Sequence, residues 1–268
     1  MITSTSNAKV KRLVNLKKRR KARDTEKVFL VEGIRMFQEV PKECLKELYV
    51  TEGFYKKEKQ LVDGRRCESG CEFEVFADTV FQYVSDTQHP QGVLCVVRQG
   101  SERNRVSDLW EKDPDGPEPL LLVLENLQDP GNMGTILRTA EAAGVTGIIM
   151  SKDCVDVFNP KVIRSTMGSV FRMPFQYVEN LTETIGEMKK AGVNTYAAHL
   201  AGENNYDDHD YRKAAAFFIG NEGNGLSDEV AQLADTYIRI PMAGKVESLN
   251  AAIAATVLMF EAGRQRRK

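Results

Sequence analysis

The chain has 268 residues, of which 42% are hydrophobic, so it is long enough for two domains with packed cores. Its net charge is −1, and its five cysteines form an odd, irregularly spaced set, which excludes a disulfide framework and favours a cytoplasmic location. The longest apolar-rich run, residues 251–260, is too short to span a membrane, so we expect no membrane association.

Positive charge gathers at both ends of the chain. Basic side chains far outnumber acidic ones in residues 1–27, and the last five residues include Arg264, Arg266, Arg267 and Lys268. Such clusters can neutralise RNA phosphates, but they also occur as solvated helix faces or frayed ends. Composition alone leaves both interpretations open.

The first hundred residues alternate short strand-like runs with helical segments. Strands are predicted at residues 28–31, 48–50, 73–76 and 92–97, and helices at 34–40 and 79–84. This pattern predicts a small α/β domain over residues 1–100. The following stretch is mostly polar and charged, with Trp110 in its middle, and its proline-rich end, residues 113–119, disfavours regular structure, so we predict a linker over residues 101–118.

The rest of the chain, residues 119–268, alternates strands and helices more regularly. Strands are predicted at residues 120–124, 147–150, 194–198, 216–219 and 237–240, and helices at 133–143, 160–167, 182–191 and 250–264. Strand–helix alternation is typical of a parallel sheet covered on both faces. We therefore predict a larger α/β domain here.

Three loops in this domain follow predicted strands, where ligands bind in parallel sheets. The first, residues 125–134, offers Asn132 as a helix N-cap, and we expect Arg138 to point from the first turns of the helix toward the loop. The second, residues 220–227, holds three glycines that allow close backbone approach, together with Glu222, whose charge disfavours a phosphate cradle. The third, residues 238–250, ends with two candidates for the N-cap of the last helix, Ser248 and Asn250.

The order and content of these loops resemble the three signature motifs of the SpoU family of RNA 2′-O-methyltransferases, in the SPOUT superfamily. The matches are N-x-G-x-I-x-R at 132–138, G-N-E-G-x-G-L at 220–226 and I-P-M-x-G-x-V-E-S-L-N at 240–250. The resemblance is close over residues 119–264. It is looser over the first hundred residues, where 29–33 and 85–92 resemble the family's RNA-binding substrate domain.

The resemblance implies an α/β knot, in which a mostly parallel sheet carries a deep trefoil knot, preceded by a smaller α/β domain with a fold like that of ribosomal protein L30e. It also implies S-adenosyl-L-methionine as cofactor, with the adenosine bound in the knot by backbone groups at Gly220, Ile240 and Leu249. Relatives place the active site across a homodimer interface, so we expect a dimer.

The same resemblance assigns activation of a ribose hydroxyl to Arg138, with Asn132, Glu222, Ser248 and Asn250 orienting the hydroxyl, the arginine or a phosphate. A guanidinium has a pKa above about 12 and scarcely deprotonates in proteins. We therefore expect Arg138 to stabilise alkoxide charge and to position a phosphate. The proton acceptor stays unassigned, because Glu222 either accepts the proton or only pairs with Arg138.

The reaction selects RNA over DNA through the 2′-hydroxyl, and a separate substrate domain favours ribosomal over transfer RNA. Two alternatives stay open: a SPOUT relative that methylates a base nitrogen, and a catalytically silent RNA-binding or ribosome-assembly factor. The histidines and cysteines lack the spacing of a metal site. Four aromatic residues are candidates for stacking on bases, although core packing is favoured for most of them: Tyr49, Phe54, Tyr55 and Tyr83.

Overall fold

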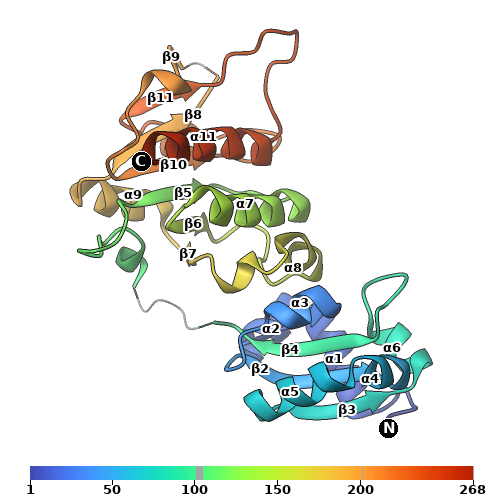
Figure 1. Ribbon diagram of the computed structural model, residues 1–268. Helices are drawn as coiled ribbons and strands as arrows, with labels where there is room; N and C mark the ends of the chain where they lie inside the picture. Colours follow the sequence, from blue (N-terminus) through green and yellow to red (C-terminus); the bar gives the residue numbers. More distant parts are fainter. Residues whose placement is uncertain (101–104, 201, 268) are drawn as a thin grey trace. The chain divides into compact units, whose positions relative to one another are not determined.

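The computed structural model describes residues 1–100, 105–200 and 202–267 (Figure 1). Contacts divide the chain into two compact units: unit 1 comprises Met1–Ser101 and Asp156–Phe171, and unit 2 comprises Glu102–Val155 and Arg172–Lys268. Among the described helices, none has the length and apolar character that a membrane span requires.

Unit 1 contains a four-stranded sheet in the order β1-β4-β2-β3. Its strands are β1 (Val28–Glu32), β2 (Leu45–Thr51), β3 (Glu72–Phe76) and β4 (Val93–Arg98). The pair β2 and β3 is parallel, and the other pairs are antiparallel. Each strand covers a run that the sequence predicts, so the small α/β domain is confirmed at the level of its sheet.

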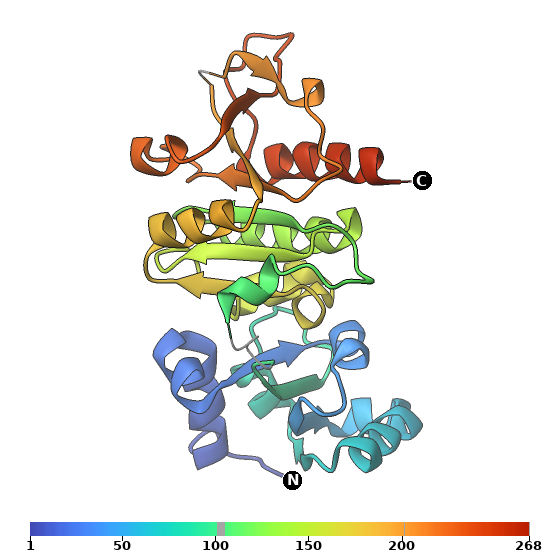
Figure 2. The same cartoon turned by 90° about the vertical axis from the view of Figure 1, so that its left-hand side faces the viewer.

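Helices cover both faces of this sheet, and Figure 2 shows α1 on one side and α5 on the other. The helices of unit 1 are α1 (Ala8–Lys18), α2 (Arg20–Glu26), α3 (Ile34–Glu39), α4 (Glu52–Lys57), α5 (Lys59–Ser69), α6 (Asp78–Val84) and α8 (Pro160–Thr166), with a 3-10 helix η2 (Ser169–Phe171). The basic amino-terminal segment is a folded helix because Val10, Leu13 and Leu16 recur at helical spacing and are fully buried. They pack with Phe81 of α6 in one core cluster.

Residues 156–171 cover the free edge of strand β1, which contacts α8. The Arg23 guanidinium forms a buried ion pair with Asp156, and the rings of Phe29 and Phe158 lie 4.7 Å apart between centroids. An uncovered edge strand would present unpaired backbone groups to other chains. This segment therefore protects β1 although it lies far along the sequence.

Unit 2 contains a seven-stranded sheet in the order β7-β6-β5-β10-β8-β11-β9, and every recorded strand pair is parallel. The strands are β5 (Leu120–Leu124), β6 (Gly147–Ser151), β7 (Phe175–Val178), β8 (Asn194–Ala198), β9 (Asn204–Asn205), β10 (Ala215–Ile219) and β11 (Thr236–Arg239). The predicted parallel sheet is confirmed. Sequence patterns missed β7, which is only half-buried, and β9, which has two residues.

The helices of unit 2 are α7 (Pro130–Ala143), α9 (Leu181–Lys190), α10 (Asp228–Ala231) and α11 (Ala251–Arg266), with 3-10 helices η1 (Val106–Leu109) and η3 (Tyr206–Asp208). Helices α7 and α11 lie side by side (Figure 1). Gly263 allows their close approach, because a Cβ atom there would lie 3.0 Å from the carbonyl oxygen of Ala143. The other sheet face is covered by α9 and α10.

The structure tests two predictions about which residues cap the helices at their N-termini. The prediction that Asn132 caps α7 is wrong, because the helix begins at Pro130 and the Asp129 carboxylate accepts the Asn132 backbone N–H at 2.7 Å. Proline at a first helical position after an aspartate is a common start. Asn250 caps α11, as one of the two predicted candidates, accepting from Ala252 N at 2.9 Å.

The predicted linker, residues 101–118, is described only in part, since 101–104 lie outside the described residues. Its remainder contains η1, and Leu109 and Trp110 are buried in the core of unit 2. This half is therefore packed rather than a free connection. The domain boundaries at residues 100 and 118 stay a prediction.

Candidate functional site

The loops after β5 and β10 leave neighbouring strands at the same edge of the unit 2 sheet. The Ser227 backbone N–H and hydroxyl both donate to the Glu125 carboxylate at 2.7 Å. The Asn221 amide donates to the carbonyl of Asn126 at 2.8 Å. The sequence did not predict these bonds between the loops, although Glu125, a charged residue directly after an apolar strand, was a signal. The bracing fixes the two loops against each other.

Gly220 lies where the second loop folds back on itself. A Cβ atom at this position would lie 2.0 Å from the carbonyl carbon of Gly225 and 2.1 Å from the nitrogen of Leu226. The backbones of Asn221 and Gly225 exchange two hydrogen bonds of 2.9 Å, which close the turn. The glycine is therefore required by the loop's own backbone crossing, and any side chain would displace the turn.

Three of the five predicted catalytic residues form one hydrogen-bonded network. The Glu222 carboxylate accepts from Asn132 Nδ2 at 3.0 Å and from the backbone N–H groups of Asp129 at 2.9 Å and Gln128 at 3.1 Å. Asn250 Nδ2 donates to Asn132 Oδ1 at 2.9 Å. The network thus joins one residue from each of the three loops.

The charge state of Glu222 follows from this network. Burial opposes ionisation of the carboxyl group, but hydrogen bonds from Asn132 and from the backbone of Gln128 and Asp129 outweigh it and hold its pKa below the usual value. The group is therefore a carboxylate at neutral pH and a weak proton acceptor. Both of its oxygens already accept hydrogen bonds, so Glu222 is held in place and orients Asn132.

Arg138 and Ser248 do not join the network. Arg138 is exposed on α7 and, by helix geometry, lies about 9 Å along the axis and about 120° around it from Asn132. Within the described ranges, neither side chain makes a hydrogen bond or ion pair, Ser248 being exposed as well. Both groups are free for a ligand or a second chain.

The predicted cofactor-binding residues differ in their surroundings. Gly220 is buried, whereas Ile240 and Leu249 are half-buried at the two ends of an exposed loop that connects β11 to α11 (Figure 1). The backbone of residues 241–249 makes no hydrogen bond to the rest of the described chain. Free backbone donors and acceptors flanked by apolar side chains fit an adenosine held by main-chain groups, so these residues can hold S-adenosylmethionine.

Comparison with family models gives two matches that together cover most of the chain. Residues 119–260 match the SpoU rRNA Methylase family, and this stretch contains all three loops of the site. Residues 7–95 match the MRM3-like substrate binding domain.

Two curated relatives are similar along nearly the whole chain. An uncharacterised tRNA/rRNA methyltransferase of Synechocystis is 34% identical, covering 99% of this chain and 94% of its own. The 23S rRNA (guanosine(2553)-2′-O)-methyltransferase RlmP of Bacillus subtilis is 30% identical, covering 97% of both.

Two solved structures with bound cofactor are similar in fold. The AdoMet-bound rRNA methyltransferase of Sinorhizobium meliloti has a TM-score of 0.85 and 32% identity, covering 100% of this chain and 98% of that one. The AviRb methyltransferase of Streptomyces viridochromogenes in complex with AdoMet has a TM-score of 0.82 and 29% identity, covering 97% and 99%. The chain therefore belongs to the SpoU rRNA methylase family.

Proposed function

We propose that the chain is an S-adenosylmethionine-dependent RNA methyltransferase that methylates a ribose 2′-hydroxyl in ribosomal RNA. The observation that carries this proposal is the network of Asn132, Glu222 and Asn250, which joins the three SpoU motifs at the carboxyl edge of the sheet. Support comes from the Bacillus subtilis relative, named as a 2′-O-methyltransferase of 23S rRNA, and from structural neighbours with AdoMet bound.

The chain's own contribution to this reaction is positioning and charge stabilisation, since the bound cofactor supplies the methyl group and the leaving group. Asn132 is held at both ends of its amide, so it presents a fixed surface to the ribose. Arg138 supplies the positive charge for the developing alkoxide or a neighbouring phosphate. Glu222 orients Asn132 rather than taking the proton, because its pKa is lowered and its oxygens are already engaged.

The position of Arg138 favours a homodimer as part of the proposal. In its own chain Arg138 makes no bond to Asn132 or to the rest of the network, and we propose that it acts in the site of a second copy. The exposed face of α11 carries an apolar stripe of Ile253, Val257 and Phe260 at i, i+4, i+7 spacing, with the first and last 49% and 46% exposed. We assign this stripe to the dimer interface, with Arg138 completing the partner's site.

The dimer is testable with charged substitutions in the stripe. In the double variant Ile253→Glu/Phe260→Glu, like charges face each other across the two-fold axis, so we expect monomers by light scattering and a loss of methyl transfer of at least tenfold. The matched control is Met167→Glu, an exposed apolar residue of unit 1. A wild-type protein that is monomeric at micromolar concentration, yet fully active, contradicts the interface.

The reaction itself is tested by nucleoside analysis of RNA incubated with the protein and labelled S-adenosylmethionine. We expect the label in a 2′-O-methylnucleoside of ribosomal RNA and not of transfer RNA. Label on a base nitrogen would move the chain to the other SPOUT chemistry. If the protein binds the cofactor but transfers no methyl group, either to mature RNA or to assembly intermediates, the chain is a catalytically silent RNA-binding factor.

Binding of the cofactor is expected to protect the loop that follows β11. Lys245 is exposed in a stretch whose backbone has no internal hydrogen bonds, so trypsin should cut there early. Saturating S-adenosylmethionine should slow this cut about tenfold, because cleavage requires the unbound state. Cleavage after Lys56, in α4 of unit 1, serves as the control and should not change. Equal protection at both sites, or at neither, would argue against cofactor binding in the loop.

Two further expectations belong to this proposal. First, we expect the chain of unit 2 to form a trefoil knot, because it resembles the SpoU family. A cytoplasmic location is the second, and it fits five cysteines that are all free in the structure together with an RNA substrate.

A further inference from the structure

Unit 1 exposes one aromatic ring among the four considered for base stacking. Tyr49 and Phe54 are buried, at 1% and 8% exposure, and the Tyr55 ring lies 5.4 Å from that of Phe73. Tyr83, near the end of α6, is 55% exposed. An exposed tyrosine places a flat apolar surface in water, where it can accept a base.

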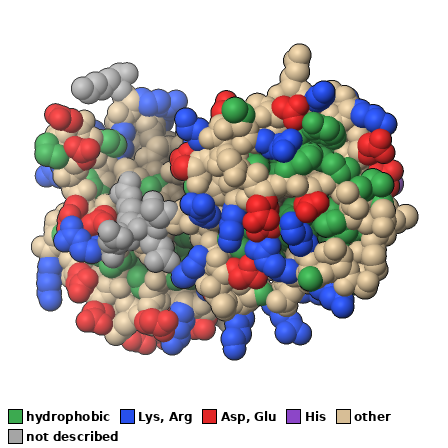
Figure 3. All heavy atoms as spheres, turned by 90° about the horizontal axis from the view of Figure 1, so that it is seen from below, with side chains coloured by type: hydrophobic (Ala, Val, Ile, Leu, Met, Phe, Trp, Pro, Cys, Tyr) green, Lys and Arg blue, Asp and Glu red, His purple; other side chains and the backbone are tan. Residues whose placement is uncertain are grey.

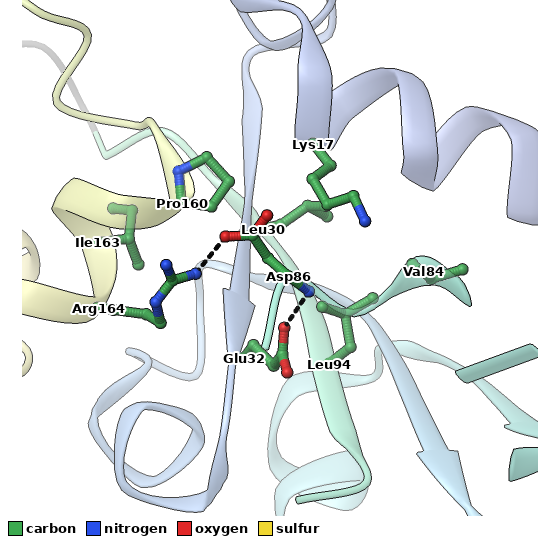
Figure 4. Close-up of a pocket in the computed structure, with 9 residues that line it drawn as sticks. All are labelled: Lys17, Leu30, Glu32, Val84, Asp86, Leu94, Pro160, Ile163 and Arg164. Atoms are coloured by element: carbon green, nitrogen blue, oxygen red, sulfur yellow. Dashed lines mark hydrogen bonds and ion pairs between the residues drawn. The ribbon is translucent and has the colours of Figure 1, made fainter. Parts of the chain in front are cut away.

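The segment that carries Tyr83 is held firmly. Lys17 of α1 donates to the carbonyl of Ser85 at 2.8 Å. The Glu32 carboxylate accepts from the Asp86 backbone at 3.0 Å and from the Thr87 hydroxyl at 2.6 Å, and Figure 4 shows Glu32, Lys17 and Asp86 around the small pocket at this place. Because the backbone next to Tyr83 is anchored, only the ring itself has to be ordered when a base stacks on it.

Free positive charge lies on α1, which contacts α6. Lys11, Asn15 and Lys18 are exposed at i, i+4, i+7 spacing and so share one helix face. The other cations of α1 are engaged, since Lys9 and Arg12 form ion pairs and Lys17 donates to Ser85. Figure 3 shows one face of the molecule, on which Lys and Arg side chains lie among those of Asp and Glu. Within the described part of the chain, Lys11 and Lys18 have no hydrogen bond or ion pair.

We propose that a single-stranded segment of the substrate RNA binds across α1 and α6, with one base stacked on Tyr83 and phosphates at Lys11 and Lys18. The proposal rests on the proposed function and names the RNA-holding surface of that enzyme. The bond from Lys17 to the carbonyl of Ser85 joins this end of α1 to the residues just after Tyr83. Lys18 is the next residue of α1. Base stacking and unpaired cations together are what sequence-tolerant binding of unpaired RNA needs.

The surroundings of Tyr83 favour RNA over a protein partner. In the described part of unit 1, the exposed large apolar side chains are Met1, Tyr83 and Met167, too few for an extended apolar interface. Protein interfaces need a contiguous, well-packed apolar core. An exposed ring on α6 and free lysines on the adjoining helix α1 instead match a polyanion with flat bases.

The test measures binding of a fluorescein-labelled short oligouridylate to the full chain. Tyr83→Ala should raise its Kd about tenfold, and Tyr83→Phe should leave it within twofold, because stacking needs the ring and not the hydroxyl. Lys11→Ala/Lys18→Ala should weaken binding and reduce the slope of log K against log salt by about 1–2. The matched control is Lys42→Ala/Lys59→Ala; both lysines are exposed, and α5, which begins at Lys59, covers the opposite face of the sheet.

Methyl transfer to ribosomal RNA is measured on the same variants. Tyr83→Ala should raise KM for RNA about tenfold with kcat unchanged, and its melting temperature should match the wild type because the side chain is exposed. An unchanged Kd in Tyr83→Ala, or equal effects of the two lysine pairs, overturns the surface. A third outcome separates the two proposals. If the wild type binds oligouridylate and these variants lose that binding, the RNA-binding surface is supported. If the wild type then transfers no methyl group to RNA, the proposed reaction is wrong.

Discussion

Replacing Arg138 by alanine is expected to lower kcat for methyl transfer by about 10²–10³-fold, the typical effect of removing one charge-stabilising donor. The side chain is exposed and has no partner in the described chain, so its loss should not disturb folding. Affinity for S-adenosylmethionine, measured by calorimetry, should stay within twofold. A selective loss in kcat would place Arg138 at the reacting oxygen or its neighbouring phosphate.

Two further substitutions sharpen this experiment. Arg138→Lys keeps the charge but not the planar fork, so its activity should fall between that of the wild type and that of the alanine variant. Lys190→Ala removes an exposed cation at the end of α9 and should leave kcat unchanged. If Arg138→Ala retains kcat within threefold, the residue has no role in the chemical step.

Removing Arg23 is expected to destabilise unit 1 by about 3–5 kcal/mol, because the buried Asp156 carboxylate would lose its counter-charge. Arg23 is 3% exposed and Asp156 8%. The Arg23 guanidinium also donates to the carbonyl of Leu16 at 2.6 Å, near the end of α1. Urea unfolding of Arg23→Ala, followed by fluorescence and circular dichroism, measures the loss.

A double variant separates the burial of charge from the loss of contact. Arg23→Met/Asp156→Leu removes both charges and keeps the volume, so it should recover most of the stability that Arg23→Ala loses. The exposed pair of Lys56 and Glu52 gives the contrast, since Lys56→Ala should leave the free energy of unfolding nearly unchanged. If Arg23→Ala lowers the free energy of unfolding as little as Lys56→Ala does, water must reach Asp156 in solution.

Local sequence signals predicted the elements well where one signal dominated. Leu120–Leu124 is the clearest case, because five consecutive apolar residues bounded by Pro119 and Glu125 favour a buried strand over a helix by their length, and the structure has the same bounds. The start of α7 was predicted at residue 133, whereas the helix begins at Pro130. The signal was present in Asp129 followed by Pro130, but Asn132 is an equally good cap by composition, and only the observed bond decides.

Long-range contacts in the site could not be read from the sequence. The bonds between Glu125 and Ser227 join residues 102 positions apart, and no periodicity encodes such a pairing. The same holds for Asp156, which joins unit 1 through a partner 133 positions away. Family motifs identified Asn132, Glu222 and Asn250 as a set, but not which atoms meet. Whether Arg138 and Ser248 act with them stays a prediction.

The strand order of unit 2 has a consequence for synthesis of the chain on the ribosome. Leu120 of β5 pairs with Ala215 of β10, so the central pairing joins segments about 95 positions apart. At a translation rate of about 5–20 residues per second, β5 waits roughly 5–20 s for this neighbour. Until then the edge of an entirely apolar strand, Leu-Leu-Leu-Val-Leu, is open to other nascent chains. The half-made protein should therefore depend on chaperones more than the finished one.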